Sequence, residues 1–198
     1  QIAGIGGKIK AKPEYFSVEE IPLYEPNGSG DHVYVRVSRE GLTTRDAAIK
    51  LAQLFNIREI DVGYAGLKDK HARTIQTFSL PLKNVSLALI RKKIQDHLPF
   101  HVHAITRHPH KLKRGHLKGN RFRVLVTETS NALDEAAAQI VDLLRRIPIP
   151  NFYGEQRFGI HRKNIVEGRK IVSGNATCKD PWLKHMFISA FQSYLFNR

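Results

Sequence analysis

One aspartate is set apart by the cations next to it in the sequence. Asp69 lies between Lys68 and Lys70, and His71 and Arg73 follow closely. Because neighbouring cations favour the ionised form of a carboxyl group, Asp69 is expected to carry its charge. Such a carboxylate beside a cationic surface can act as a nucleophile or a base on a bound polyanion. A solvated turn aspartate is the structural alternative, since Asp is common in turns.

A stretch of strong positive charge supplies candidate contacts to a polyanion. Residues 91–123 hold ten of the 32 Lys and Arg residues and six of the ten histidines, against one acid, Asp96. The whole chain has 18 Asp and Glu residues and a net charge of +14. This concentration favours a phosphate-binding face; the alternatives are a generally basic protein and a solvated charge run. We interpret four side chains as phosphate contacts: Lys111, Lys113, Arg114 and Lys118.

Two histidine pairs raise the question of a metal site. On a strand His101 and His103 would share one face, and His108 and His110 lie nearby in the sequence. Neither a cysteine nor an acid stands close enough to complete a ligand shell, and the surroundings are cationic. We therefore expect no metal and assign these histidines to the basic surface. The glycine-rich segment 4–8 lacks the preceding strand and the following helix start of a phosphate-binding loop.

Composition excludes several classes of protein. Of the 198 residues 41% are hydrophobic, which is too many for a disordered chain and enough for one large domain. The only cysteine, Cys178, excludes a disulfide scaffold and a zinc site built on cysteine pairs. No apolar run reaches the roughly 18–20 residues that cross a bilayer, and no signal peptide is visible. We expect a cytoplasmic protein that binds no membrane.

The periodicity of apolar residues predicts the elements that position these candidates. Strand-like patterns occur at 15–21, 32–37, 60–64, 74–80, 101–107 and 121–128. Helical spacing predicts helices near 43–55, 87–98, 133–147, 164–173 and 181–197. Asp69 would then lie on a charged turn between two strands, and the four phosphate contacts would lie mainly in a polar loop at 108–119. Strands and helices interleave without strict strand–helix–strand repeats, so we predict an α+β domain with a mixed, largely antiparallel sheet.

The segment around Asp69 resembles the signature of the TruD family of tRNA pseudouridine synthases. The shared core is Gly66-Leu67-Lys68-Asp69-Lys70, with Thr74 and Gln76 downstream. Four further blocks match in the family's order: Lys10 with residues 13–20, where Tyr15 replaces the usual Asp; residues 111–122; residues 150–159, where Phe152 and Tyr153 are exchanged; and residues 189–197. A lone Lys-Asp-Lys is a weak signal, but five ordered blocks over nearly the whole chain argue against coincidence.

The resemblance implies a reaction and a partner. Members of this family isomerise uridine to pseudouridine in tRNA, typically at position 13, and an aspartate initiates cleavage of the N-glycosidic bond. They use no metal, nucleotide or redox cofactor, so we expect no cofactor here and a monomer that binds tRNA. A uridine within structured RNA must be flipped into a pocket, read on its edge and stacked against an aromatic ring.

The resemblance also assigns roles to individual positions. Asp69 matches the catalytic aspartate, and Lys10 matches a basic residue near it. Phe16 and Asn120 match positions that contact the target nucleotide, and Phe122 matches a pocket aromatic next to the flipped base. The alternatives are structural: a Phe on a strand is most often core, and an Asn that follows a glycine is often a turn residue.

Family members are longer than this chain, which affects the expected domains. The resemblance implies a pseudouridine-synthase-like catalytic domain at 1–158, incomplete without a C-terminal segment, and the helical start of an insertion domain at 159–198. A non-catalytic basic RNA-binding module, or an inactive fragment of such an enzyme, is the rival hypothesis. The two differ at Asp69, because an acid at the centre of a cationic site would repel phosphate and has no use in a pure binding module.

Overall fold

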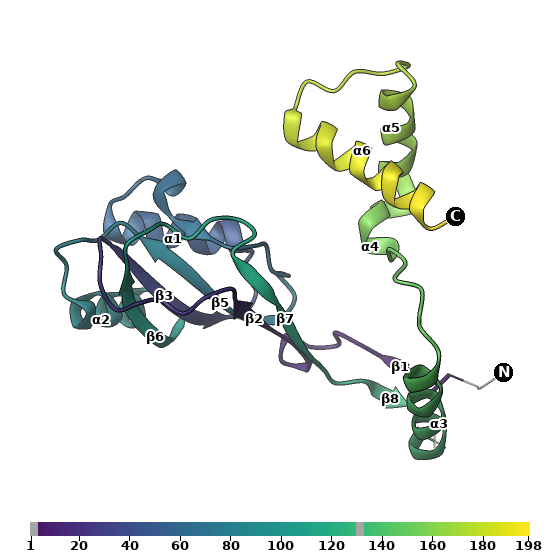
Figure 1. Cartoon of the computed structure of the whole chain (residues 1–198), viewed down its shortest axis with the longest axis horizontal. Coiled ribbons are helices and arrows are strands. Elements are labelled where there is room, and N and C mark those ends of the chain that lie inside the picture. Colours follow the sequence, from purple (N-terminus) through teal and green to yellow (C-terminus); the bar gives the residue numbers. More distant parts are fainter. Residues whose placement is uncertain (1–3, 130–132) are drawn as a thin grey trace. The chain divides into compact units, whose positions relative to one another are not determined.

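The chain divides into two units, Gln1–Ala137 and Ala138–Arg198. The structure is a computed structural model that describes residues 4–129 and 133–198 (Figure 1). The first unit contains every residue to which the sequence analysis gave a role in chemistry or RNA contact. The predicted division into a catalytic domain at 1–158 and the start of an insertion domain at 159–198 stays a prediction.

A six-stranded sheet forms the centre of the first unit. Its strands are β2 (Phe16–Pro22), β3 (His32–Arg39), β4 (Gly63–Tyr64), β5 (Arg73–Leu80), β6 (His101–His108) and β7 (Leu117–Val124). The strand order is β6-β3-β5-β2-β7, and β4 pairs with β5 outside this path. The β2–β5 pair is parallel, and the pairs that involve β3, β4 and β7 are antiparallel. This arrangement confirms the predicted mixed, largely antiparallel sheet.

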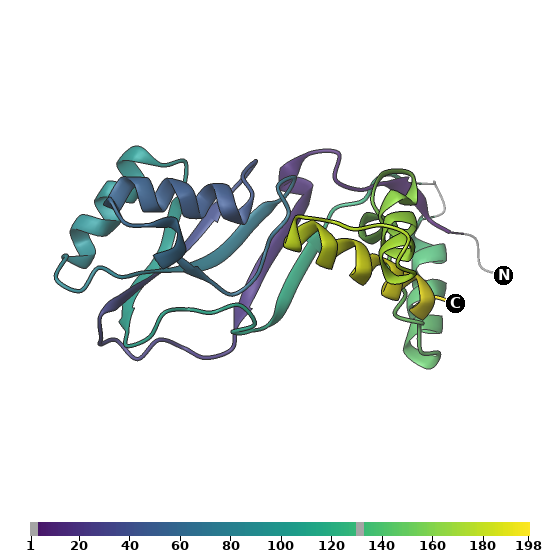
Figure 2. The same cartoon turned by 90° about the horizontal axis from the view of Figure 1, so that it is seen from above.

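Two helices cover one face of this sheet, α1 (Thr44–Phe55) and α2 (Leu87–His97) (Figure 2). The start of α1 is fixed by a capping box, in which Thr43 and Asp46 bond each other's backbone N–H. Apolar residues at helical spacing then pack against the inward side chains of β3 and β5. The fully buried members include Val35, Leu51, Phe78, Ile90 and Ile94. This core makes the sheet a rigid platform for the loops at its ends.

Strand β7 begins earlier than its sequence pattern predicts, and this changes the setting of two candidates. The alternation indicated a strand at 121–128, whereas β7 spans Leu117–Val124 because it pairs along the length of β2. Asn120 therefore lies opposite Glu20 within the strand and not in a turn. Lys118 is the extra residue at a β-bulge, where the register shifts. Beyond it, β8 (Thr127–Thr129) pairs with β1 (Gly6–Lys8).

The second unit is helical. Its elements are α4 (Glu155–Phe158), η3 (Ile160–Arg162), α5 (Lys163–Val172) and α6 (Pro181–Phe196), and α3 (Leu133–Arg146) crosses the boundary between the units. Gly168 allows the close approach of α5 to α6, because a β-carbon there would collide with the carbonyl of Phe187. Asp180 caps α6 by accepting from two backbone N–H groups. The two predicted helices in this region are confirmed within a few residues.

Candidate active site

Asp69 lies on the connection between β4 and β5, next to a lysine from the N-terminal segment. The Nζ atom of Lys10 is 3.8 Å from Asp69 Oδ2, and both side chains are about one-third exposed, at 32% and 31%. Lys10 has a φ of 59°, a left-handed conformation that is uncommon for residues other than glycine. The two residues are 59 positions apart, so the fold brings together a pair that the sequence analysis placed in separate motifs.

A phenylalanine ring on strand β2 lies next to Lys10, and a second ring, on β7, lies next to the first. The Lys10 ammonium lies 4.1 Å from the centroid of the Phe16 ring, a cation–π contact. The Phe16 ring in turn lies 6.1 Å from the ring of Phe122, with an interplanar angle of 57°. Phe16 is buried, whereas Phe122 is 57% exposed on the edge strand β7. Phe16 therefore has the surroundings of a core residue, and Phe122 offers a solvent-facing ring on which a base could stack.

Asn120 lies on the same side of β7 as Phe122. Side chains alternate along a strand, so positions 120 and 122 share a face. The register sets Asn120 opposite Glu20 and Phe122 opposite Val18. Asn120 is exposed, and its amide can donate and accept hydrogen bonds at the edge of a base. A carboxylate, an ammonium, an exposed aromatic ring and an amide thus occur along β2, β7 and the adjoining loops.

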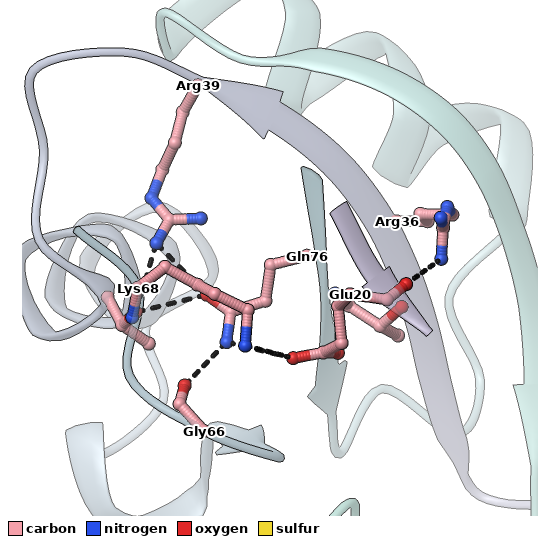
Figure 3. A network of polar contacts seen from close by, with 8 residues as sticks. Glu20, Arg36, Arg39, Gly66, Lys68 and Gln76 are labelled. Carbon is pink, nitrogen blue, oxygen red and sulfur yellow. Dashed lines mark hydrogen bonds and ion pairs between the residues drawn. The ribbon is translucent and has the colours of Figure 1, made fainter. Parts of the chain in front are cut away.

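Buried polar side chains bond Gly66 and Lys68, which precede Asp69 on the same loop (Figure 3). The ammonium of Lys68 lies 2.9 Å from Glu20 Oε2, and both side chains are only 2% exposed. Gln76 Nε2 donates to the Gly66 carbonyl at 2.6 Å and to Glu20 Oε2 at 3.3 Å. Lys68, whose charge the sequence analysis assigned to the surroundings of Asp69, is therefore paired inside the protein with Glu20.

A threonine and an arginine complete this buried group. The backbone N–H of Lys68 donates to Thr44 Oγ1 at 2.8 Å. Arg39 Nη2 donates to Thr44 Oγ1 and to Gln76 Oε1, both at 3.0 Å. Burial lowers the pKa of the Arg39 guanidinium to about 10, an effect that Glu20 and Asp46 partly offset, so Arg39 stays charged at neutral pH.

Sequence reasoning gave no role to most of this buried group, although the sequence carries a signal for it. Glu20 continues the inward alternation that Phe16 and Val18 begin, and Gln76 precedes Phe78 on the inward face of β5. A polar residue at an inward position of a strand requires a buried partner. The identity of the partner depends on strand pairing, which the local pattern does not contain.

The predicted phosphate contacts fall into two places. Lys111, Lys113 and Arg114 line an open hollow of about 720 Å³ together with Arg58, Tyr64 and neighbouring residues, and Asp69 is not among its lining residues. The Arg114 guanidinium lies 5.8 Å from the centroid of the Tyr64 ring. Lys118, by contrast, is exposed at the bulge in β7, two positions from Asn120.

The sequence analysis also considered a metal site at the histidine pairs and a membrane-spanning segment. The rings of His101 and His103 meet edge to face at 4.8 Å. Within residues 4–129 and 133–198, no three or more His, Cys, Asp or Glu side chains gather in a group that could hold a metal ion. In the same described part of the chain, every helix is too short or too polar to span a bilayer.

Comparisons with known proteins agree with one another. The family model described as tRNA pseudouridine synthase D (TruD) matches residues 1–179. The tRNA pseudouridine synthase D of a Thermus thermophilus strain is 40% identical over 196 residues, which are 99% of this chain and 54% of that protein. The enzyme of that name from Geobacter metallireducens is 41% identical over 175 residues, which are 88% and 42% of the two chains.

A solved structure shares the fold. The crystal structure of a tRNA pseudouridine synthase D (TruD) from Methanosarcina mazei aligns with this chain with a TM-score of 0.71 at 24% sequence identity. The alignment covers 98% of this chain and 49% of the Methanosarcina mazei chain. The chain spans about half the length of the curated relatives that it matches. On the family match over residues 1–179 and the 40% identity to relatives, the chain belongs to the TruD family.

Proposed function

We propose that this chain is the catalytic-domain portion of a tRNA pseudouridine synthase, with Asp69 as the catalytic carboxylate. The observation that carries the proposal is the position of Asp69: its loop is anchored by buried polar side chains, and its carboxylate lies 3.8 Å from the Lys10 ammonium. The substrate is a uridine in tRNA, with position 13 as the proposed target. Family membership supports the reaction class.

The reaction is an isomerisation that the chain's own residues can serve without an oxidant or a reductant. The bond between C1′ of the ribose and N1 of the uracil breaks, the base turns, and a bond from C1′ to C5 forms. A proton leaves C5 and a proton is gained at N1, so atoms and electrons balance. Asp69 initiates the cleavage as a nucleophile or a base. The Lys10 ammonium places a positive charge beside the Asp69 carboxylate.

We assign the nucleotide pocket to side chains of strands β2 and β7 near Asp69. Phe122, with its exposed ring, stacks against the flipped uracil, a contact of about 1–3 kcal/mol per base. Asn120 reads an edge of the base or its ribose from the same face of β7. Phe16, which matches a family position that contacts the target nucleotide, borders the same pocket from the interior, with its ring 6.1 Å from that of Phe122. Each of these roles is supported by position and exposure.

The phosphates of tRNA are proposed to contact Lys111, Lys113, Arg114 and Lys118. Lys113, Arg114 and Lys118 are exposed, so their cations can reach a phosphate from solvent. The Lys111 ammonium donates to the Ile60 carbonyl and would have to share or leave that bond. The hollow of about 720 Å³ beside Tyr64 is large enough to admit part of an RNA backbone. A monomer in the cytoplasm, with a catalytic domain at 1–158 and the start of an insertion domain at 159–198, completes the proposal.

The proposal is tested by pseudouridine formation in an unmodified tRNA transcript. The chain is compared with its Asp69→Asn variant, and the Thermus thermophilus relative serves as the positive control. We expect product from the unaltered chain and a rate at least about 100-fold lower from the variant, because the acid–base or nucleophilic group is lost. The affinity of the variant for tRNA should be equal or slightly higher, since a negative charge is removed.

Two results would contradict the catalytic assignment. Equal rates for both proteins would exclude Asp69 as the catalytic carboxylate. Tight tRNA binding without any product, in an assay where the positive control succeeds, would favour the rival hypothesis of an RNA-binding module.

A further inference from the structure

Two backbone atoms just before Asp69 are held by side chains from other elements. The Gly66 carbonyl accepts from Gln76 Nε2 at 2.6 Å, and the Lys68 N–H donates to Thr44 Oγ1 at 2.8 Å. Gln76 belongs to β5, and Thr44 is the first residue of α1. The backbone is therefore tied to a strand and to a helix at points three residues and one residue before the carboxylate.

The side chain of Lys68 adds a third tie. Its ammonium pairs with Glu20, whose other oxygen, Oε1, accepts from the Thr77 N–H at 3.3 Å. Glu20 is thus fixed between β2 and β5. Buried ion pairs are weak contributors to stability, because well-packed apolar residues of similar volume often serve as well or better. A buried pair at this position is better explained by a need for one defined geometry of the loop.

Thr44 is the residue in which these contacts meet. Its hydroxyl donates to Gln76 Oε1 at 3.1 Å and accepts from Lys68 N–H and from Arg39 Nη2. One donated and two accepted bonds use the full capacity of a hydroxyl group. The capping box of Thr43 fixes the first turn of α1, so the Thr44 hydroxyl has a rigid base.

We infer that Glu20, Arg39, Thr44, Lys68 and Gln76 form an anchoring network that positions Asp69 for reaction. They are positioning residues: they act on the substrate only through the loop, and Asp69 is the group that touches the reacting nucleotide. The inference rests on the proposed function for its effect on rate. It also gives the two lysines of the Lys-Asp-Lys motif different roles, since Lys68 is buried in the network and Lys70 is exposed.

The test compares Thr44→Val with Thr44→Ser. Valine keeps the shape of threonine but removes the hydroxyl, whereas serine keeps the hydroxyl. We expect amide hydrogen exchange across residues 64–72 to accelerate at least about tenfold in Thr44→Val. The rate of pseudouridine formation at saturating tRNA should fall about 10- to 100-fold, because a displacement of about 1 Å can reduce a rate to this extent. The dissociation constant for tRNA should be unchanged, and Thr44→Ser should resemble the unaltered chain in every measurement.

The inference is overturned if loop exchange and rate in Thr44→Val match the unaltered chain, or if Thr44→Ser loses as much as Thr44→Val. It is also overturned if the unfolded fraction, measured by circular dichroism, accounts for the whole loss of rate. If the unaltered chain makes no pseudouridine, the proposed function fails for this chain, while loop exchange in the two variants still decides the anchoring.

A second variant guards against a misfolded Thr44→Val. The double substitution Glu20→Gln with Lys68→Met removes both charges of the buried pair together, so neither is left unpaired. We expect a folded protein whose loop exchanges faster and whose turnover falls while the KM for tRNA stays constant. A folded double variant with unchanged exchange in residues 64–72 would contradict the inference.

Discussion

The loop that carries Asp69 and the segment from Lys111 to Gly115 differ in where their charged side chains lie. The first is tied from the interior by a buried ion pair and by side-chain hydrogen bonds to its backbone. The second is bonded through its backbone, where Leu112 N–H donates to Ser79 Oγ and Gly115 N–H donates to the Ala65 carbonyl, and through the Lys111 ammonium, which donates to the Ile60 carbonyl. Two of its cationic side chains, Lys113 and Arg114, are exposed to solvent.

This difference fits the two tasks that we propose. Breaking a glycosidic bond requires the reacting atoms to meet within a fraction of an ångström, so the carboxylate must be fixed. Neutralising a phosphate acts over a Debye length of about 8 Å at physiological salt and tolerates motion of long side chains. Buried polar groups therefore bond the loop of the carboxylate, whose position must be fixed. Exposed cations occur in the segment that we propose to bind phosphate, where a positive charge within reach is sufficient.

The largest expected effect separates the two lysines that flank Asp69. Lys68→Met leaves the Glu20 carboxylate buried without its ammonium partner, so the free energy of unfolding should fall by about 3–5 kcal/mol. Lys70→Met, at an exposed position, should change it by less than about 0.5 kcal/mol. Urea denaturation of both variants measures the difference. Equal stabilities would mean that the buried pair is not the anchor described here.

Removing two exposed cations should weaken RNA binding without affecting the chemistry. In the double variant Lys113→Gln with Arg114→Gln, the slope of log affinity against log salt should fall by about 2. At ~0.15 M salt a slope lower by about 2 corresponds to about a 40-fold loss of tRNA affinity. Titrations at several salt concentrations provide the slope. An unchanged slope would place the phosphate path elsewhere on the protein.

Phe122 tests the comparison from the side of the nucleotide pocket, because it is exposed and we propose that its ring stacks on the target base. Phe122→Ala should weaken productive binding of the target nucleotide by about tenfold, the loss of one stacked base. Phe122→Tyr keeps the aromatic face and should retain most of the productive binding of the target nucleotide. Since the side chain is 57% exposed, thermal stability should change little in either variant. KM for a tRNA transcript is the measurement, and an alanine variant with an unchanged KM would remove Phe122 from the pocket.

The smallest expected effect is a pH dependence of stability from the histidines beside the cationic segment. Burial lowers the pKa of His32 and of His108, with smaller contributions from Lys111 and His110 respectively. The folded pKa lies below the unfolded value of about 6.5, so the unfolded chain binds more protons as the pH falls. The free energy of unfolding should therefore be highest above pH ~6.5 and should decrease as the pH falls below that value.

Melting temperatures at pH 7.5 and pH 5.5 measure this effect. A His108→Asn variant should lose less on acidification than the unaltered chain, because one of the histidines whose pKa burial lowers, which include His32 and His103, no longer titrates. A loss of the same size in both proteins would show that His108 does not contribute to the acid sensitivity.

The sequence predicted the sheet and most helices because their signals are local. The alternation of Val33, Val35 and Val37 indicates a half-buried strand without reference to the rest of the chain. The predicted start of β7 was wrong, because pairing with β2 extends the strand back to Leu117. The residues from 117 to 120 show no alternation of apolar and polar side chains that would indicate a strand. Pairing between distant strands is a global property, and a single strand pattern does not contain it.

The candidate site shows the same division. Asp69 was found from its cationic neighbours and its motif, and Lys10 from the family resemblance. Thr44 was seen only as part of a helix start, although its hydroxyl bonds the loop 24 residues further on. Contacts of this kind depend on how α1 and β5 meet the loop in three dimensions. Their sequence signal is limited to a polar residue where an apolar one is expected.

The most direct test of this account is to measure binding and chemistry separately in two variants on one tRNA transcript. Dissociation constants and single-turnover rates of pseudouridine formation are determined for Asp69→Asn and for the double variant Lys113→Gln with Arg114→Gln. We expect Asp69→Asn to lose rate and keep affinity, whereas the double variant should lose affinity and keep its rate at saturating tRNA. Parallel losses of rate and affinity in both variants would contradict the separation of the two regions.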